Sequence, residues 1–136
     1  MRTHNISLVT ILIIAALTFI GSSCEEDPII GPDPGKDPIR VSFTITSRVV
    51  TSTSLTVSGK VKNIGSSTIT AYWYIEGQFY EDNTFTLLLG GDVTTINVPL
   101  NPGVETLWNL KLSDPDIAEG NYPNFAVKDL VAYYTK

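Results

Sequence analysis

Few residues in this 136-residue sequence can do covalent or metal chemistry. It contains one cysteine, Cys24, and one histidine, His4, both near the N-terminus. Nucleophilic systems of the Ser-His-Asp or Cys-His type need a histidine, and the second type also needs a free thiol. Protein zinc sites usually draw on the same two residue types. Neither is present downstream of Cys24, where only carboxylates and lysines remain for chemistry. We therefore expect a non-enzymatic protein without a cofactor.

One group of carboxylates is a weak candidate for a calcium site. Asp114, Asp116 and Glu119 lie within six positions of one another around a proline. Calcium takes several oxygen ligands, but the spacing here is not that of an EF-hand loop. A capped turn explains the same residues, because a serine precedes them, proline suits a first helical turn and glycine ends one. We expect a single helix-like turn over 113–120 and no metal site.

A set of aromatic residues offers a second candidate site: Tyr72, Tyr74, Phe79 and Tyr80. Tyr72 and Tyr74 alternate with Trp73, so in a strand the tyrosines point away from the tryptophan's side. Exposed rings in a row can stack on sugars or anchor a protein partner. Half-buried tyrosine is also common in strands, where a loop or a second sheet covers it. We favour the covered arrangement and keep the open ligand face as the alternative.

The first 23 residues have the organisation of a secretion signal. A short polar start with Arg2 leads into the apolar run 6–20 and then the small residues 21–23. A helix needs about 20 apolar residues to span a bilayer, so this run is short for a permanent anchor and fits a cleaved signal. Cys24, directly after the small residues, resembles the acylated cysteine of bacterial lipoprotein signals. The resemblance implies lipid on its sulfur, cleavage after residue 23, and a Gram-negative outer membrane lipoprotein.

The segment 24–38 has the composition of an extended tether. After Cys24 it contains four prolines and five acidic residues. Proline lacks an N–H and favours extended geometry in the residue before it, so neither a helix nor a central strand is expected. Such a spacer reaches roughly 40 Å. The trio Glu25, Glu26 and Asp27 resembles the short acidic export signal of surface lipoproteins in some Gram-negative bacteria, which implies a surface-facing protein.

Residues 39–136 show the alternating pattern of β-strands. Apolar residues recur at every second position, and turn signals separate the runs by about 8–12 residues. We expect a bend at Gly77, a tight turn at 90–92 and a bulge near 128–129. The pattern predicts an all-β, Ig-like antiparallel β-sandwich of about seven strands, with these expected ranges: 39–46, 55–62, 69–75, 84–89, 93–100, 104–112 and 124–134.

Two segments of this domain resemble a known family. The segment 57–65 (VSGKVKNIG) is similar to the G-x-V-x-N-x-G opening of bacterial FxLYD-type Ig-like modules. The segment 100–108 (LNPGVETLW) is similar to their later L-x-P-G segment. The resemblance covers most of residues 55–112. It implies an Ig-like sandwich in an exported protein and no catalytic activity, because these modules are scaffolds.

The charge of the chain limits its partners. It carries 9 Lys and Arg against 14 Asp and Glu, a formal net charge of −5. An acidic chain gains nothing from counterion release on DNA or RNA, so we expect no nucleic-acid partner. The expected partners are the membrane, through the lipid, and an envelope protein or a glycan. The sequence thus predicts a lipid-anchored cell-envelope lipoprotein displaying an Ig-like binding or assembly domain, with a surface carbohydrate-binding module as the alternative.

Overall fold

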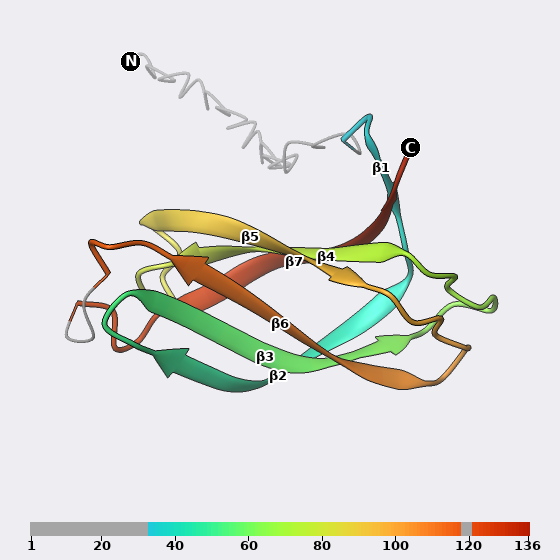
Figure 1. Ribbon diagram of the computed structural model, residues 1–136, viewed down its shortest axis with the longest axis horizontal. Coiled ribbons are helices and arrows are strands. Elements are labelled where there is room, and N and C mark those ends of the chain that lie inside the picture. Colours follow the sequence, from blue (N-terminus) through green and yellow to red (C-terminus); the bar gives the residue numbers. More distant parts are fainter. Residues whose placement is uncertain (1–32, 118–120) are drawn as a thin grey trace, which may run out of the picture.

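The computed structural model describes residues 33–117 and 121–136 as two antiparallel sheets packed face to face (Figure 1). The four-stranded sheet has the order β1-β7-β4-β5, and the three-stranded sheet has the order β2-β3-β6. The predicted all-β sandwich is therefore confirmed. No helix long and apolar enough to cross a membrane occurs in the described ranges. The strands are β1 (Lys36–Pro38), β2 (Val41–Val50), β3 (Ser54–Asn63), β4 (Trp73–Tyr80), β5 (Leu88–Ile96), β6 (Glu105–Ser113) and β7 (Ala126–Thr135).

The core lies between the two sheets and follows the alternation of the sequence. On β4, Trp73, Ile75 and Phe79 are fully buried, and the residues between them are half-buried on the opposite face. From the other sheet, Trp108 of β6 packs edge-on against Phe43 of β2, with ring centroids 5.7 Å apart. Removing these apolar faces from water is the main force that holds the sheets together.

The expected bend at Gly77 and the expected bulge near 128–129 are one feature. The pairing of β4 with β7 shifts register between Glu76 and Gln78, and Asp129 opposite has a left-handed φ of 57°. A Cβ atom on Gly77 would lie 2.9 Å from side-chain carbons of both Leu110 and Leu130. Glycine at this position therefore leaves the space that these two leucines fill.

The expected tight turn at 90–92 is wrong. β5 runs without a break through Gly90 and Gly91, and no separate strand forms over 84–89. A Cβ on Gly90 would lie 3.0 Å from a side-chain carbon of Leu112, and one on Gly91 would lie 2.7 Å from the side-chain oxygen of Gln78. Both glycines therefore allow close packing within a strand, a role that their sequence cannot distinguish from a turn.

Other segment borders also differ from expectation: β2 is Val41–Val50 where 39–46 was expected, β4 is Trp73–Tyr80 where 69–75 was expected, and β5 ends at Ile96 rather than at 100. Residues 36–38, which we expected in the tether, form β1 and pair with β7. Pro38 is tolerated there because an edge strand needs hydrogen bonds on one side only. In 113–117, the described part of the expected helix-like turn, the N–H of Asp116 donates to Oδ1 of Asp114 at 2.8 Å, and the N–H of Ile117 donates to the Asp114 carbonyl at 3.1 Å. These two bonds define a tight turn closed by Asp114.

One buried polar side chain, Asn63 at the end of β3, joins two connections. It is 1% exposed, and its Nδ2 donates to the carbonyls of Ser67 and Leu100, both at 2.8 Å. Its Oδ1 accepts the N–H of Gly65 at 2.9 Å. The amide therefore links the β3–β4 connection to the end of the β5–β6 connection.

Replacing this amide is expected to destabilise the fold strongly. Asn63→Ala removes three hydrogen bonds and leaves the Ser67 carbonyl and the Gly65 N–H without this partner, while the Leu100 carbonyl keeps the N–H of Ile69. Each buried unpaired group costs about 1–3 kcal/mol. We expect the free energy of unfolding to fall by about 3 kcal/mol or more. Urea unfolding followed by tryptophan fluorescence measures the change. Asn109→Ala, on the exposed outer face of β6, is the matched control. Equal losses in the two variants would contradict this role for Asn63.

Candidate functional site

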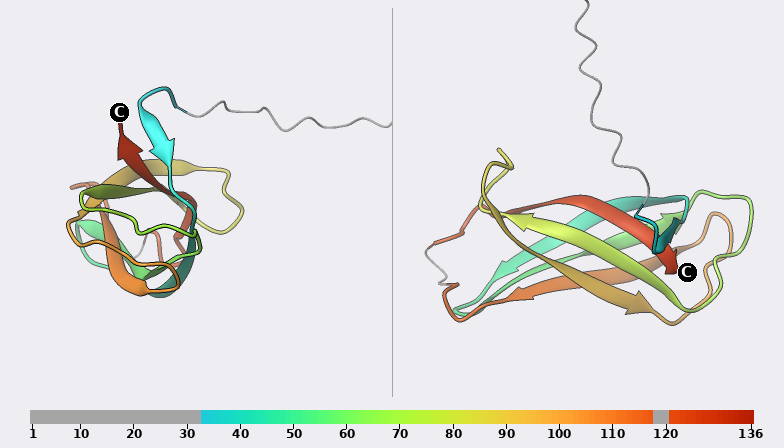
Figure 2. Two further views of the ribbon diagram at one scale, coloured as in Figure 1. Left: turned by 90° about the vertical axis from the view of Figure 1, so that its right-hand side faces the viewer. Right: turned by 90° about the horizontal axis from the view of Figure 1, so that it is seen from above.

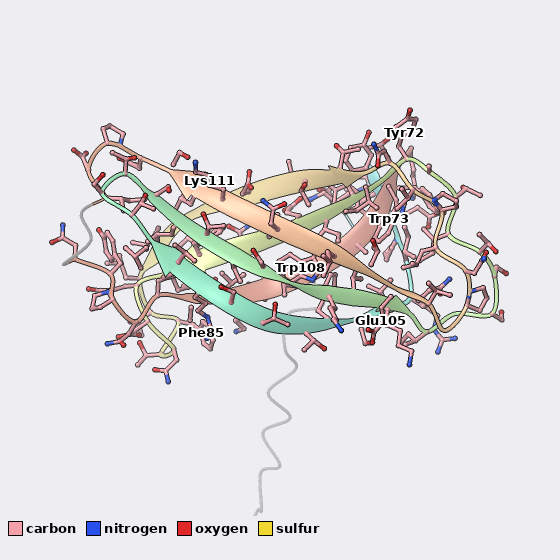
Figure 3. All side chains as sticks on the ribbon, turned by 60° about the horizontal axis from the view of Figure 1, so that its bottom comes forward. Tyr72, Trp73, Phe85, Glu105, Trp108 and Lys111 are labelled. Carbon is pink, nitrogen blue, oxygen red and sulfur yellow. The ribbon has the colours of Figure 1, made fainter. Side chains whose placement is uncertain are left out.

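The two ends of the sandwich carry different parts of the chain (Figures 1 and 2). Lys36 of β1 pairs with Thr135 of β7, so the N-terminal segment joins the domain beside its C-terminus. We call this end the tether pole. The connections β2–β3, β4–β5 and β6–β7 lie at the opposite end, which we call the distal pole. Figure 3 shows the same separation, with Tyr72 and Glu105 toward one end and Phe85 toward the other.

The outer face of the four-stranded sheet carries the aromatic candidate site. β4 presents alternate, half-buried side chains on this face. Tyr133 of β7 pairs with Tyr74, and Lys36 reaches over from β1. We call this surface the tyrosine face and define it by six residues: Lys36, Tyr74, Glu76, Gln78, Tyr80 and Tyr133.

A compact cluster of contacts organises the tether-proximal half of the tyrosine face. Tyr74 and Tyr133 stack with ring centroids 5.6 Å apart and an interplanar angle of 23°. Lys36 Nζ donates to Oε2 of Glu76 at 2.7 Å and lies 4.9 Å from the Tyr133 ring centroid. The Tyr133 hydroxyl donates to the same Oε2 at 3.2 Å. One carboxylate oxygen therefore joins β1, β4 and β7.

This cluster shifts the titration of two of its members. The hydrogen bond from Lys36 to Glu76 raises the pKa of the lysine above its ordinary value of 10.5. Burial, and secondarily the Glu76 charge, raises the pKa of the Tyr133 phenol above 10.0. Both groups hold their protons at neutral pH, and the shifts extend this to higher pH, as expected where Lys36 and Tyr133 share the Glu76 carboxylate.

The structure brings together only part of the predicted aromatic set. Tyr74 and Tyr80 lie on the tyrosine face, where Tyr80 packs edge-on against Phe85. Tyr72 is 65% exposed but lies in the connection before β4, and Figure 3 shows it at the rim of the molecule. Phe79 is fully buried and stacks on Phe125 in the core, so its place in a ligand face is wrong. Its odd position number puts it on the same side of β4 as Trp73.

A shallow hollow lies beside the tyrosine face. It has a volume of about 240 Å³ and forms over Gly91, where the strand has no side chain. Glu76, Gln78 and Val93 are among the residues that line it. The hollow presents amide and carboxylate groups next to an apolar surface. This chemistry suits hydrogen bonding to a polar ligand, but the Glu76 oxygen is already bonded to Lys36 and Tyr133.

The remaining predicted site residues are those of the lipid anchor, the export signal and the calcium candidate. Cys24, Glu25, Glu26 and Asp27 lie outside the described residues, as does Glu119 of the calcium candidate. Within 33–117 and 121–136, no three His, Cys, Asp or Glu side chains gather as metal ligands.

Sequence reasoning did not include Lys36, Glu76 and Tyr133 in the site. Tyr133 lies in the expected strand 124–134, and alternation along one strand does not show which residue of another strand it faces. Its position opposite Tyr74 depends on pairing between strands nearly 60 residues apart. Lys36 was assigned to the tether, so its contact with Glu76 had no local signal.

No protein-family model matches this sequence, and no curated protein matches it significantly. The resemblances to lipoprotein signals and FxLYD-type modules therefore depend on the residues quoted for them.

The ion pair on the tyrosine face predicts a specific pH dependence. The pKa of Lys36 is raised in the folded state. The stabilisation of the fold by the protonated Lys36 is therefore complete below pH 10.5 and is lost as the pH rises through the folded-state pKa. Lys36→Met should lower the free energy of unfolding at neutral pH by about 1 kcal/mol or less, since the pair is partly exposed.

Urea unfolding between neutral pH and about pH 12 measures this dependence, because that range spans the titration of a lysine. The difference between wild type and Lys36→Met should shrink toward zero at the alkaline end. Lys62→Met removes an exposed lysine of β3 and is the matched control. A difference that persists unchanged at high pH would mean that Lys36 stabilises the sheet through packing alone.

Proposed function

We propose that this protein is a non-enzymatic lipoprotein of the Gram-negative cell envelope, anchored by lipid on Cys24 and displaying its sandwich for binding or assembly. The observation that carries the proposal is the order of segments: the apolar run 6–20, three small residues, the only cysteine, and an acidic, proline-rich stretch. Each buried acyl methylene contributes about 0.8 kcal/mol, so two or three chains hold a protein on a membrane essentially permanently.

The strand order supports an Ig-like assignment for the displayed domain. In an Ig-like sandwich, strands A, B and E share one sheet, and C, F and G share the other. β2, β3 and β6 take the places of A, B and E, while β4 and β7 take those of C and F. The short β1 lies beside β7 in the place of G.

The contacts of Asn63 support the resemblance to FxLYD-type modules. Its position in the G-x-V-x-N-x-G pattern is that of a buried amide bonded to the connections around it. Gly65 follows closely, and a Cβ there would lie 3.2 Å from the Asn63 side-chain oxygen. Val61 is fully buried in the core. The pattern therefore has a structural purpose in this domain and needs no catalytic one.

The two poles support display on a tether. The lipid would lie N-terminal to β1, so the tether pole would face the membrane and the distal pole would point away from it. The acidic trio at 25–27 supports placement on the outer surface of the cell. An anchored, outward-pointing domain without catalytic residues is suited to recognition.

A carbohydrate-binding module using the tyrosine face is the second candidate function. The hollow over Gly91, with Gln78 and Tyr80 near it, favours this candidate. Against it, Tyr74 and Tyr133 stack on each other, so a sugar cannot use the ring faces that they share.

The anchor is tested by acylation. In the natural host, labelled fatty acid should enter the wild-type protein and be absent from Cys24→Ala, because no other residue supplies a thiol. Ser23→Ala keeps a small residue before the cysteine and should stay labelled. Equal labelling of wild type and Cys24→Ala would refute the anchor.

The surface assignment is tested separately. Replacing Glu25, Glu26 and Asp27 together with alanine should preserve acylation but protect the domain from protease added to intact cells. If wild type and the triple variant are degraded equally, the trio is not the export signal. If neither is degraded until the cells are opened, the domain faces the periplasm.

A further inference from the structure

A cleft lies at the distal pole of the sandwich, away from the tyrosine face. Its volume is about 640 Å³, within the range of about 300–1,000 Å³ that is usual for small-ligand sites. β2 contributes Arg48, the β4–β5 connection contributes Asp82 and Asn83, and the β6–β7 connection contributes Asn124. The buried Phe125 forms part of its wall. The cleft shares no residue with the tyrosine face.

The side chains around the cleft have a distinctive mixture of hydrogen-bonding groups. Arg48 supplies only donors, Asp82 supplies acceptors, and the two asparagine amides supply both. Arg48 and Asp82 make no ion pair among the described residues, so one fixed charge of each sign lines the same cleft. Unlike Glu76 on the tyrosine face, the side chains of Asn83 and Asn124 make no hydrogen bond with the described part of the protein.

Part of the cleft is held in place before any ligand binds. Oδ1 of Asp82 accepts the N–H of Thr84 at 2.8 Å and its hydroxyl at 2.6 Å, and the Asp82 carbonyl accepts the N–H of Phe85. This turn holds Phe85 at a left-handed φ of 56°, which is unusual for a bulky residue. On the other side, Phe125 stacks on Phe79 of the core with ring centroids 6.0 Å apart.

The donor and acceptor pattern selects among ligand classes. An anion would meet the Asp82 carboxylate, whose pKa is lowered by its bonds to Thr84. A cation would meet the Arg48 guanidinium, and an apolar ligand would strip water from four polar side chains without replacing it. A compound rich in hydroxyl groups both donates and accepts hydrogen bonds and carries no charge, so it suits the donors and the acceptors of this cleft.

We propose that the distal cleft binds a neutral saccharide, held by hydrogen bonds that Arg48 donates, that Asp82 accepts, and that the amides of Asn83 and Asn124 donate and accept. The inference deepens the proposed display function and rests on it for biological meaning, because display from the tether pole turns this cleft outward. The ligand would be the end or a short stretch of a neutral glycan. It differs from the second candidate function in location, because it does not use the tyrosine face.

A glycan array tests the proposal with the full chain purified in detergent. The array carries neutral oligosaccharides of glucose, mannose, galactose and xylose beside sulfated and sialylated ones. We expect binding to a neutral member that is insensitive to salt. Asn83→Ala and Asn124→Ala should each weaken it by about tenfold, the effect of losing one hydrogen bond. Their urea midpoints should match wild type, because neither side chain bonds within the described structure.

Two variants of the tyrosine face, Tyr74→Ala and Gln78→Ala, serve as matched controls and should retain binding. Loss of binding in these controls with retention in Asn124→Ala would overturn the proposal and move the site to the tyrosine face. Binding only to charged glycans, or to none at millimolar protein, would also overturn it. Failure of the anchor appears separately, as absent acylation of Cys24 in a protein that still binds sugar.

Discussion

The crossings between sheets impose the strictest constraint on this fold. At the tether pole the chain passes from β3 to β4 and from β5 to β6, and each crossing brings backbone polar groups to the edge of the core. Unpaired groups there would cost as much as the packing gains. The buried side chain of Asn63 bonds to both connections. Its own backbone adds bonds to Gly103 and Val104, and a backbone bridge between Ile69 and Leu100 joins the same two connections.

Two carboxylates of the four-stranded sheet, on β4 and β5, hold strands at the edges of the sandwich in place. On one side Glu76 accepts hydrogen bonds from Lys36 and Tyr133 and so holds the short β1 against β7. On the other side Oδ2 of Asp92, on β5, accepts the backbone N–H of Lys111 on β6 at 2.7 Å. Edge strands with free N–H groups invite pairing with other chains, and the Asp92 contact reduces that risk by occupying a backbone N–H of β6. Both carboxylates therefore make contacts that stabilise the fold.

Much of the fold follows from the alternation of apolar and polar residues, because a strand with one buried face has an apolar residue at every second position. Trp73, Ile75 and Phe79 share a parity and are all buried, which also removes Phe79 from the predicted ligand face. The sequence also predicts the bend at Gly77 and the bulge opposite it. The turn predicted at Gly90 and Gly91 is wrong, because close packing against Leu112 and Gln78 requires glycine just as a tight turn does. Contacts such as Tyr74 with Tyr133 depend on strand pairing, which local sequence does not encode.

The tyrosine face and the distal cleft differ in whether their polar side chains are already bonded within the protein, and this difference bears on which surface could bind a ligand. On the tyrosine face the carboxylate of Glu76 is bonded within the protein, and two of the tyrosine rings pack on each other. At the distal pole, the exposed residues Asn83 and Asn124 lie on surface connections and line the distal cleft. Under the proposed display function, hydrogen bonds and shape would carry recognition. Because the side chains of Asn83 and Asn124 make no hydrogen bond with the described part of the protein, ligand binding at the distal cleft would not draw on the contacts that hold the sheets together.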